Sequence, residues 1–329
     1  MKAIVTDTYG TPDVLMFRDV DPPTAGDDEV LVRVHAASVN PLDWHYTTGT
    51  PYVLRLSAGL RRPKRPIRGV DMAGRVESVG AKVTAFRPGD AVFGAAGGSL
   101  AEYASVSEND LAHLPPTMSF EDAAAMPIAA VTALQLLRDH ARLQAGQSVL
   151  INGAAGGVGT FAVQIAKALG AQVTGVCSTT NVEMVRSLGA DHVVDYTKHD
   201  FAADDRRYDI LFDNVGNRSF SDCRRALTPK GTYVIVGGPK TGKWLGPLKR
   251  LVAAKVRFAF ASQRSVSLMA KITEKELLAL VGLIESGEIR SVIDRRYPLS
   301  STADAVRYLA EGHAKGKVII TVIDEPAAA

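Results

Sequence analysis

Glycines spaced for phosphate binding stand in the stretch SVLINGAAGGVGTFAVQIAKALG at 148–170. In the six-residue register of a dinucleotide fingerprint, Ala154 takes the first glycine position, and Gly156 and Gly159 take the second and third. The second position lets backbone approach a pyrophosphate, and the third lets the following helix pack closely on the strand. Free N–H groups and the positive end of the helix dipole would then receive the phosphates. The alternative is a glycine turn before an ordinary helix.

The sequence offers few other groups with the spacing that catalysis or metal binding requires. Only two cysteines occur, Cys177 and Cys223, and neither has a second cysteine nearby to complete a metal site. No Gly-x-Ser-x-Gly elbow is present, so a serine hydrolase has no support. The histidines show no spacing typical of a metal site or a triad; those considered are His35, His113, His140, His192 and His199.

Composition favours an ordinary globular chain of two domains. Hydrophobic residues make up 46% and charged residues 22% of the 329 residues, a length that exceeds one typical domain. The net charge of +3 is too small to argue for nucleic acid. Two cysteines indicate a reducing compartment, and neither a signal-peptide core nor an apolar run of transmembrane length is found. We therefore expect a cytoplasmic protein without a membrane partner.

The elements that would position the glycine turn are a strand and a helix. The apolar run at 149–151 is typical of a buried strand, and Phe161, Ile165 and Leu169 share one face of the helical pattern that follows. From residue 148 strand and helix patterns alternate at βαβ spacing. Strands are expected at 148–153, 172–177, 192–195, 208–213, 232–236 and 256–261, and helices at 158–169, 181–188 and 219–227. Six such strands predict a doubly wound parallel sheet.

The flanking parts of the chain have a different pattern. Residues 1 to about 120 show strands and turns, with strands expected at 29–36, 69–80 and 89–93. The segment 47–66 is expected to be irregular, and its basic run RRPKR at 61–65 is typical of a solvated loop, or otherwise of an anionic-ligand rim or a nucleic-acid contact. Ser119 is expected to cap an Ala-rich helix through Leu137. Beyond residue 262 the patterns predict helices near 274–286 and 302–311, strands near 292–298 and at 317–323, and a frayed tail at 325–329.

Taken together and in order, the motifs resemble those of a known family. The chain is similar to the medium-chain dehydrogenase/reductase superfamily, in its zinc-independent quinone-oxidoreductase branch, and within that branch to reductases related to the reticulon-interacting mitochondrial protein. The resemblance runs nearly end to end and is far more specific than the glycine turn alone. Its landmarks are YGTPDVL at 9–15, ASVNPLD at 37–43, GVDMAG at 69–74, RPGDAV at 87–92, AAGGVG at 154–159, DNVG at 213–216 and GHAKGK at 312–317.

The resemblance implies an α/β architecture of two folds. A Rossmann doubly wound parallel sheet at 122–263 would bind the dinucleotide. A GroES-like, β-rich catalytic domain would be built from 1–121 and completed by the segment 264–329. In this family the active site lies in the cleft between the two.

The resemblance also implies that no zinc is bound. In the zinc-dependent relatives a cysteine ligand sits where this chain has Asn40, and a histidine ligand where it has Val70. Neither side chain here offers the thiolate or imidazole that tetrahedral zinc favours. Without a Lewis acid, reduction of an electron-poor quinone or enone is easier to support than oxidation of an alcohol.

Three residues are the candidates for catalysis. Asn40 is the first, as a hydrogen-bond donor to the nascent enolate or hydroquinone anion; the alternative is a turn residue before Pro41. Tyr46 and Tyr52 are candidate proton donors or stacking walls, with an amphipathic surface ring as the alternative for each. Asp43 is expected to cap or brace this loop.

NADPH is the expected cofactor, in preference to NADH. NAD-binding versions carry an acidic residue at the end of the second strand, whereas this chain continues as STTN at 178–181. Tyr196 matches a family tyrosine that reaches the 2′-phosphate, although the lysine that several relatives carry just after the second strand is missing. The full set expected to bind cofactor is Ala155, Gly156, Gly157, Val158, Ser178, Thr179, Tyr196, Asn214, Gly237, His313, Ala314 and Lys315.

The sequence therefore favours an NADPH-dependent reductase of quinones or α,β-unsaturated carbonyls. An enoyl-thioester reductase of the same superfamily and a non-catalytic NADP(H)-binding protein are the alternatives, and the basic run at 61–65 is the feature that favours the latter. A homodimer is also expected, because relatives pair through the edge of the Rossmann sheet and 256–261 is the candidate edge strand.

Overall fold

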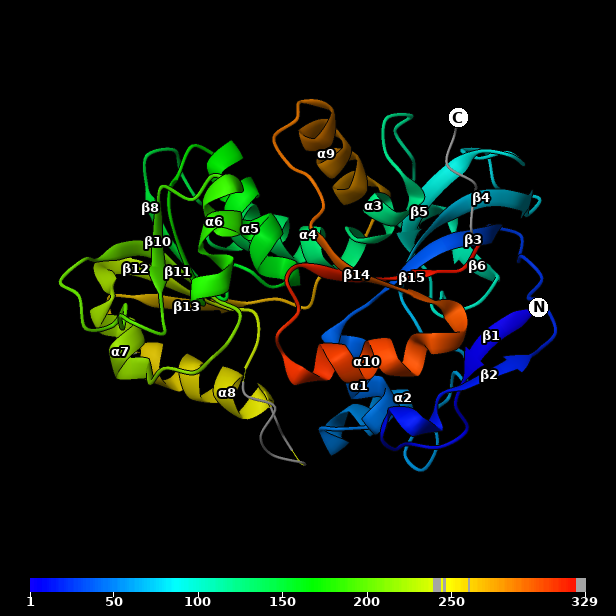
Figure 1. Ribbon diagram of the computed structural model, residues 1–329, viewed down its shortest axis with the longest axis horizontal. Helices are drawn as coiled ribbons and strands as arrows, with labels where there is room; N and C mark the ends of the chain where they lie inside the picture. The colour runs from blue at the N-terminus through cyan, green and yellow to red at the C-terminus, as the bar shows by residue number, and fades with distance from the viewer. Residues whose placement is uncertain (239–243, 245–246, 260, 324–329) are drawn as a thin grey trace. The chain divides into compact units, whose positions relative to one another are not determined.

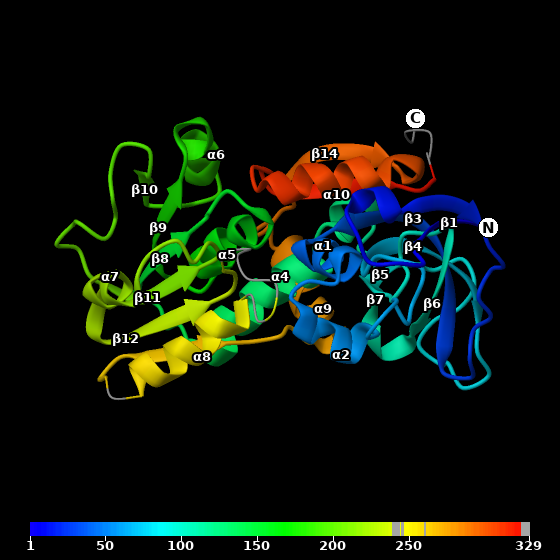
Figure 2. The same cartoon turned by 90° about the horizontal axis from the view of Figure 1, so that it is seen from below.

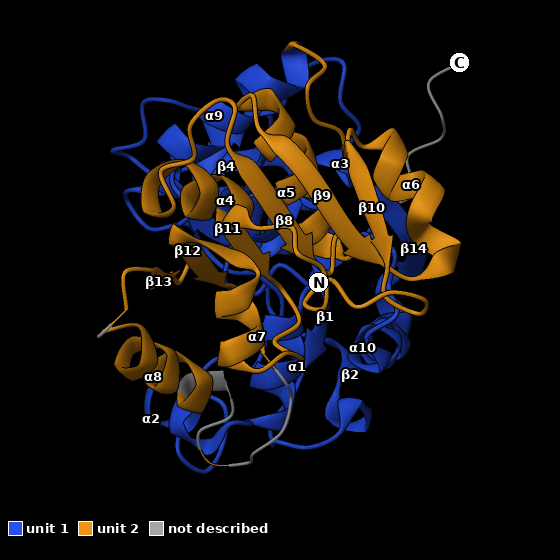
Figure 3. Ribbon diagram, turned by 90° about the vertical axis from the view of Figure 1, so that its left-hand side faces the viewer, with its two compact units in different colours: residues 1–131, 271–285, 291–329 blue, residues 132–270, 286–290 orange. Residues whose placement is uncertain are grey.

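The structure is a computed structural model that describes residues 1–238, 244, 247–259 and 261–323. The tail predicted at 325–329 lies outside the described residues. The chain forms two compact units (Figure 3): unit 1 holds residues 1–131, 271–285 and 291–329, and unit 2 holds residues 132–270 and 286–290. The domain boundaries at 121 and 263 stay predictions.

Unit 2 is built on a parallel sheet with six strands in the described residues, in the order β10-β9-β8-β11-β12-β13. The chain moves outward from β8 to β10 and then crosses back to β11. Such a reversal of strand order places a ligand crevice at the carboxyl ends of the central strands. The strands are β8 Ser148–Asn152, β9 Gln172–Cys177, β10 His192–Asp195, β11 Tyr208–Asp213, β12 Leu227–Ile235 and β13 Arg264–Ser267. The predicted doubly wound sheet is confirmed.

Helices cover both faces of this sheet, with α5 and α6 on one side and α7 and α8 on the other (Figure 1). Helix α5 begins directly after the glycine turn and buries Phe161 and Ile165. These two residues are four apart, so they lie on the same face of the helix. The bounds are α5 Gly157–Ala168, η5 Thr179–Asn181, α6 Val182–Ser187, α7 Phe220–Arg225 and α8 Pro247–Phe258.

The prediction that 256–261 forms the sixth strand is wrong. Residues up to Phe258 belong to α8, and the edge strand is β13, which pairs in parallel with β12. The apolar run suggested a strand, but Leu251, Ala254 and Phe258 recur at helical spacing and pack into the core of this unit. Phe258 stacks on Tyr233, with ring centroids 5.6 Å apart.

Unit 1 consists mainly of antiparallel strands (Figure 2). Within the described residues seven strands form one sheet, in the order β14-β15-β3-β4-β5-β7, with β6 also paired to β3. Strand β15, near the C-terminus, pairs antiparallel with β3, so the last segment of the chain completes this sheet. The strands are β3 Glu29–Val39, β4 Asp71–Val79, β5 Ala91–Ala95, β6 Tyr103–Ser107, β7 Leu111–His113, β14 Ile293–Pro298 and β15 Lys317–Thr321; β1 Lys2–Val5 and β2 Met16–Asp19 form a separate pair.

Short helices connect the strands of unit 1, and two expectations are corrected here. The segment 47–66 is not irregular throughout, because it contains the last residues of α1 and the whole of η2 and α2. The helix expected from Ser119 through Leu137 is split: α3 ends at Ala124, and Pro127, which has no N–H to continue the first helix, starts α4. The bounds in unit 1 are η1 Pro12–Val14, α1 Pro41–Thr48, η2 Tyr52–Leu54, α2 Arg55–Ala58, η3 Glu108–Asp110, α3 Phe120–Ala124, α9 Glu274–Glu285, η6 Leu299–Ser301 and α10 Thr302–Glu311. Helix α4 Pro127–Leu134 begins in unit 1 and ends in unit 2, which holds the π-helical η4 Gln135–His140.

Among the described residues, no helix combines the length and the apolar composition needed to cross a membrane.

Candidate active site

A cluster of buried polar side chains joins three strands of unit 1. The Lys317 Nζ donates a hydrogen bond to Asn40 Oδ1 at 2.6 Å and lies 3.2 Å from Asp71 Oδ2. The Asn40 Nδ2 donates to the same Asp71 oxygen at 2.8 Å, and Ser38 Oγ donates to it at 2.9 Å. The Asn40 carboxamide is therefore bonded to the Lys317 ammonium through its oxygen and to the Asp71 carboxylate through its nitrogen.

Strand register brings these residues together from distant parts of the chain. Lys317 is the first residue of β15, Asn40 follows the last residue of β3, and Asp71 is the first residue of β4. Strands β15 and β4 both run antiparallel to β3 here. Asn40 and Lys317 are each 3% exposed, and Asp71 is fully buried. Because a buried charge is tolerated only when it is paired and hydrogen-bonded, Lys317 and Asp71 depend on each other.

The orientation of the Asn40 carboxamide follows from the chemistry of its neighbours. A lysine ammonium can only donate, so it must face Oδ1, and a carboxylate can only accept, so it must face Nδ2. The usual ambiguity of an amide flip is therefore removed. Among the described residues Nδ2 has Asp71 as its acceptor, which uses one of its two hydrogens. The second hydrogen has no acceptor among the described residues.

Asp43 braces the start of α1 beneath Asn40, as predicted. Its Oδ2 accepts a hydrogen bond from the Asn40 backbone N at 2.7 Å. The carboxyl is buried, and this burial is the main cause that raises its pKa to about 7. The Asn40 hydrogen bond opposes that rise, whereas the nearby Asp71 adds to it.

The two candidate tyrosines have different surroundings within unit 1. Tyr46 is half-buried in α1, and its phenol lies close enough to the Arg68 guanidinium to affect the pKa of that arginine. Tyr52 is half-buried at the start of η2, with its ring centroid 4.6 Å from Arg55 Cζ. Arg55 Cζ also lies 4.4 Å from the Tyr9 ring centroid. Tyr46 thus lies near the buried Arg68, whereas the ring of Tyr52 contacts the Arg55 guanidinium.

In unit 2 the glycine turn lies at the carboxyl edge of the sheet, between β8 and α5. Gly153 has φ +79°, which other residues rarely adopt. A Cβ on Gly159 would lie 2.1 Å from Gly153 O, so only glycine permits this close approach of helix and strand. Gly156 is the N-cap of α5, which opens with Gly157 and Val158, and the first N–H groups of a helix have no partner inside it. The turn therefore presents free donors to an anion.

Two buried amide oxygens at this edge have no hydrogen-bond partner among the described residues, Asn214 Oδ1 after β11 and Asn181 Oδ1 after β9. The Asn214 Nδ2 donates to Asn152 O at 3.0 Å, which directs the amide. A Cβ on Gly237 would lie 2.2 Å from Asn214 O, so glycine is needed where the chain passes this loop. Buried acceptors of this kind call for a donor, and a dinucleotide offers carboxamide and ribose donors. The residues of this edge therefore fit such a cofactor.

The ribose side of the edge holds a carboxylate that the sequence analysis did not consider. Asp195 ends β10 opposite Cys177, and it accepts hydrogen bonds from Thr179 Oγ1 at 2.6 Å and Thr197 Oγ1 at 2.7 Å. These hydrogen bonds lower the pKa of Asp195 to about 2, and the one from Thr179 has the largest effect. The segment 178–181 contains no carboxylate, as noted above, but the neighbouring strand brings one to it. The Thr179 hydroxyl is engaged by that carboxylate.

Other groups on this side can meet a phosphate. Ser178 Oγ accepts a hydrogen bond from Asn181 Nδ2 at 3.1 Å, and Tyr196 is 53% exposed. The Lys198 Nζ lies 3.5 Å from Asp195 Oδ2. Lys198 thus supplies a positive charge beside the ribose edge, where the chain lacks the lysine of several relatives after β9.

The C-terminal motif GHAKGK at 312–317 lies in unit 1. His313 and Lys315 are exposed, and Ala314 packs against the core of that unit. The Lys315 backbone N donates to Asp294 Oδ2 at 3.0 Å. The role of His313, Ala314 and Lys315 in covering a cofactor stays a prediction.

The positions of the zinc ligands in metal-dependent relatives hold Asn40 and Val70. Among the described residues, no three His, Cys, Asp or Glu side chains are grouped to hold a metal ion. Cys177 and Cys223 are buried free thiols, and burial raises their pKa values to about 11 and about 12. Metal independence stays a prediction.

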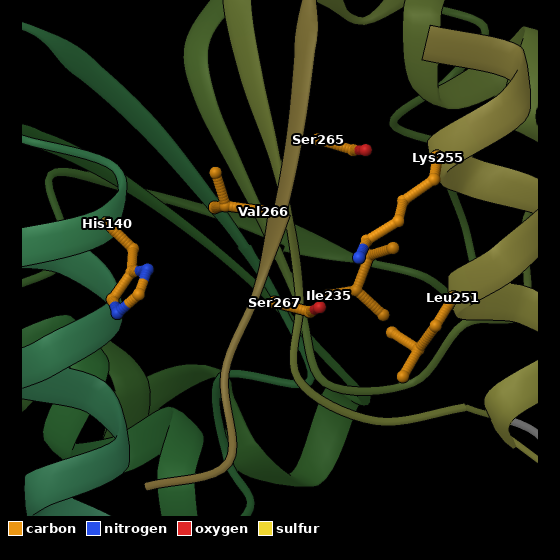
Figure 4. A pocket seen from close by; sticks show the side chains of 7 residues that line it. All are labelled: His140, Ile235, Leu251, Lys255, Ser265, Val266 and Ser267. Atoms are coloured by element: carbon orange, nitrogen blue, oxygen red, sulfur yellow. The ribbon is translucent and has the colours of Figure 1, made fainter. Parts of the chain in front are cut away.

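A cavity of about 250 Å³ opens beside the edge strand β13 of unit 2. Figure 4 shows the Lys255 side chain reaching from α8 toward Ile235 and Ser267. These two residues end β12 and β13, so the cavity reaches the carboxyl edge, where doubly wound sheets bind ligands. The lining residues are His140, Ile235, Leu251, Lys255, Ser265, Val266 and Ser267.

Sequence reasoning missed Lys317, Asp71 and Arg68 as site residues. The available signal was a charged residue at the start of an otherwise apolar, buried strand, as in KVIIT at 317–321 and DMA at 71–73. A charge at such a position needs a partner, although the sequence does not show which.

Comparisons with known proteins identify the family and support the fold. Residues 26–116 match a model described as alcohol dehydrogenase GroES-like domain, and residues 188–320 match one described as zinc-binding dehydrogenase. The quinone-oxidoreductase QR1, chloroplastic, of Triphysaria versicolor is 33% identical, covering 97% of this chain and 98% of that protein. The NAD(P)H oxidoreductase RTN4IP1, mitochondrial, of Bos taurus is 33% identical, covering 98% and 89%. The structure of Escherichia coli quinone oxidoreductase complexed with NADPH has a TM-score of 0.83 at 26% identity, covering 98% and 100%.

The chain belongs to the quinone-oxidoreductase family of the medium-chain dehydrogenase/reductase superfamily, and it is an oxidoreductase. The resemblance in the motifs is thereby confirmed. So is the combination of a Rossmann-type sheet with a GroES-like domain.

Proposed function

We propose that this oxidoreductase uses NADPH to reduce quinones or α,β-unsaturated carbonyls without a metal. The observation that carries the proposal is the Asn40 carboxamide, which Lys317 and Asp71 orient and which keeps one Nδ2 hydrogen to donate. Reduction of such a carbonyl places negative charge on its oxygen, and a pre-oriented donor in a buried site stabilises that charge. Quinone oxidoreductases among the relatives support the same substrate class.

The chemistry divides between the cofactor and this chain's own residues. A bound nicotinamide would supply a hydride to an electron-poor carbon of the substrate. When the hydride adds to that carbon, the electron pair of the C=C bond forms a new double bond to the carbonyl carbon, and the C=O π pair moves onto the oxygen, to which Asn40 Nδ2 donates. The Lys317 ammonium on Oδ1 polarises the amide and makes it a better donor. A proton from water, or from Tyr46 or Tyr52, completes the reduction.

NADPH is the proposed cofactor on the strength of the ribose edge. The segment 178–181 offers hydroxyls and no carboxylate, and Lys198 adds a positive charge. Asp195 acts against a 2′-phosphate, but two hydroxyls and Lys198 share its charge. The Escherichia coli quinone oxidoreductase complexed with NADPH supports this choice.

A screen of NADPH oxidation over quinones, enals, enones and enoyl-CoA tests the proposal. We expect turnover with quinones or enones that is unchanged by EDTA, and a kcat about 100-fold lower in Asn40→Ala, because that variant loses one donor to the developing oxyanion. Turnover confined to enoyl-CoA would assign the protein to the enoyl-thioester reductases. No oxidation with any substrate would overturn an enzymatic role for these residues and leave a non-catalytic NADP(H)-binding protein.

We also propose a homodimer, now paired through β13 in place of 256–261. Strand β13 is at the edge of the parallel sheet formed by the described residues, and an edge strand favours pairing with a second copy. Light scattering at micromolar concentration should give twice the mass of the chain, and a monomeric mass would contradict the proposal. A cytoplasmic location stays a prediction, because the relatives named above carry chloroplastic and mitochondrial in their names.

A further inference from the structure

The guanidinium of Arg68 is a buried cation that the fold leaves unsatisfied. The residue is 7% exposed, and neither Nε nor Nη2 has a hydrogen-bond partner among the described residues. Arg250, the interior arginine of unit 2, differs: its Nη2 donates to Tyr233 OH at 2.6 Å and to Arg218 O at 3.0 Å. Lys317, the other buried lysine or arginine among the described residues, is also bonded. The Nε of Arg218 is also unsatisfied, but its Nη2 lies 3.1 Å from Asp200 Oδ1, whereas Arg68 has no ion pair among the described residues and needs an explanation.

The neighbours of Arg68 do not supply the missing acceptor. Burial lowers its pKa, and Tyr9, Asp43 and Tyr46 are the groups whose charge acts against that shift. The Tyr9 OH donates to Gly59 O at 2.6 Å, and Asp43 Oδ2 accepts from the Asn40 backbone. Asp43 therefore lies within electrostatic reach of the guanidinium but forms no hydrogen bond with it.

The two unsatisfied nitrogens identify the kind of ligand. The Nε–H and Nη2–H groups lie on one edge of the planar guanidinium and point in the same direction. This pair matches the two oxygens of a carboxylate in a bidentate contact, which also balances the charge. A neutral quinone oxygen would fill one position only and would leave the cation uncompensated.

The sequence before Arg68 suits an anionic ligand as well. Arg61, Arg62, Lys64 and Arg65 are exposed in the loop that leads into Arg68. A cluster of one sign attracts the opposite charge and raises its local concentration. The basic run, which the proposed function leaves unused, thus places positive charge in the sequence just before the buried guanidinium.

We infer that Arg68 binds a carboxylate of the substrate, so that the enone or quinone reduced by this enzyme carries a carboxylic acid. The inference rests on the proposed function for the reduced group, but binding of the acid does not depend on turnover. Both nitrogens are shielded from solvent, so the groups that cover them must move aside when the carboxylate binds.

Calorimetry with 3-benzoylpropionate and its methyl ester tests the inference without any reaction, since the two differ only in the carboxylate. The wild-type protein should bind the acid about 10- to 100-fold more tightly than the ester, the range that charge-assisted hydrogen bonds supply. Arg68→Met should remove this difference. Arg87→Met is the matched control, because it removes an exposed positive charge of unit 1 outside that loop and should keep most of the preference.

The reactive pair is (E)-3-benzoylacrylate and its methyl ester with NADPH. The Arg68→Met substitution should lower kcat/KM for the acid and leave that for the ester nearly unchanged, and thermal unfolding should show that the variant is folded. Equal binding of acid and ester by the wild type, or an acid affinity that Arg68→Met does not reduce, would overturn the inference and leave Arg68 hydrated. Failure of the proposed function has a separate signature, which is tight binding of the acid with no oxidation of NADPH by any substrate.

Discussion

Lys317→Met is expected to lower the free energy of unfolding by about 3–5 kcal/mol, because it removes one partner of a buried ion pair. Asp71 would keep donors from Ser38, Asn40 and the Ile128 backbone N, but it would lose the ammonium that balances its charge. Urea unfolding at neutral pH measures the change.

The control for this prediction is Lys82→Met in the same unit. The Lys82 Nζ lies 2.9 Å from Asp27 Oδ2, but its side chain is 72% exposed. Exposed pairs contribute at most about 1 kcal/mol, so this variant should remain close to the wild type. Equal losses in the two variants would show that Lys317 and Asp71 do not depend on each other.

The same substitution tests the catalytic part of the cluster. Lys317→Met should lower kcat with a quinone about 10-fold or more and change KM far less, because the donor it supports acts on the charge that develops during reaction. If Lys317 acts through Asn40, combining Lys317→Met with Asn40→Ala should add little to the loss of either one. If the losses in kcat of the two single variants add up in the double variant, Lys317 does not act through Asn40 and its role is structural.

The sequence predicts those parts of the fold whose signals are local. The run at 149–151, the glycines and the spacing of Phe161 and Ile165 specify a strand, a turn and a helix within one short stretch. The strand predicted at 256–261 was wrong because VRFAFA is largely apolar and rich in residues that favour strands. Tertiary packing, and not this local preference, decides the secondary structure there. Phe258 belongs with Leu251 and Ala254 on a helix face that begins well before that segment.

The candidate site is less predictable, because its parts meet through strand register. Asn40 was accessible from its motif, and the glycine edge from its spacing. The Lys317 contact with Asn40 joins residues 277 positions apart, and Asp195 reaches Thr179 across two strands. No local sequence pattern specifies such contacts. Whether the Arg68 nitrogens find hydrogen-bond acceptors depends on the three-dimensional packing around them, which the sequence does not show.

Ser178→Asp is expected to reverse the cofactor preference from NADPH to NADH. Ser178 follows β9 directly, at the position where NAD-binding folds place a carboxylate on the ribose hydroxyls. Its hydroxyl has only Asn181 and Thr180 as partners among the described residues, so a carboxylate can replace it without loss of a core contact. That new charge would stand beside the ionised Asp195, whose pKa of about 2 keeps it negative at neutral pH.

Two negative groups at this edge should repel a 2′-phosphate strongly. A charge pair about 4 Å apart near a protein surface is worth several kcal/mol, so the ratio of kcat/KM for NADPH to that for NADH should fall about 100-fold. Ser187→Asp, at the exposed end of α6, adds the same charge away from the edge and should leave the ratio unchanged. Asp195→Asn should raise the ratio, because it removes the negative group already there. A wild-type preference for NADH, or a ratio that Ser178→Asp does not change, would show that the 2′-phosphate is bound elsewhere.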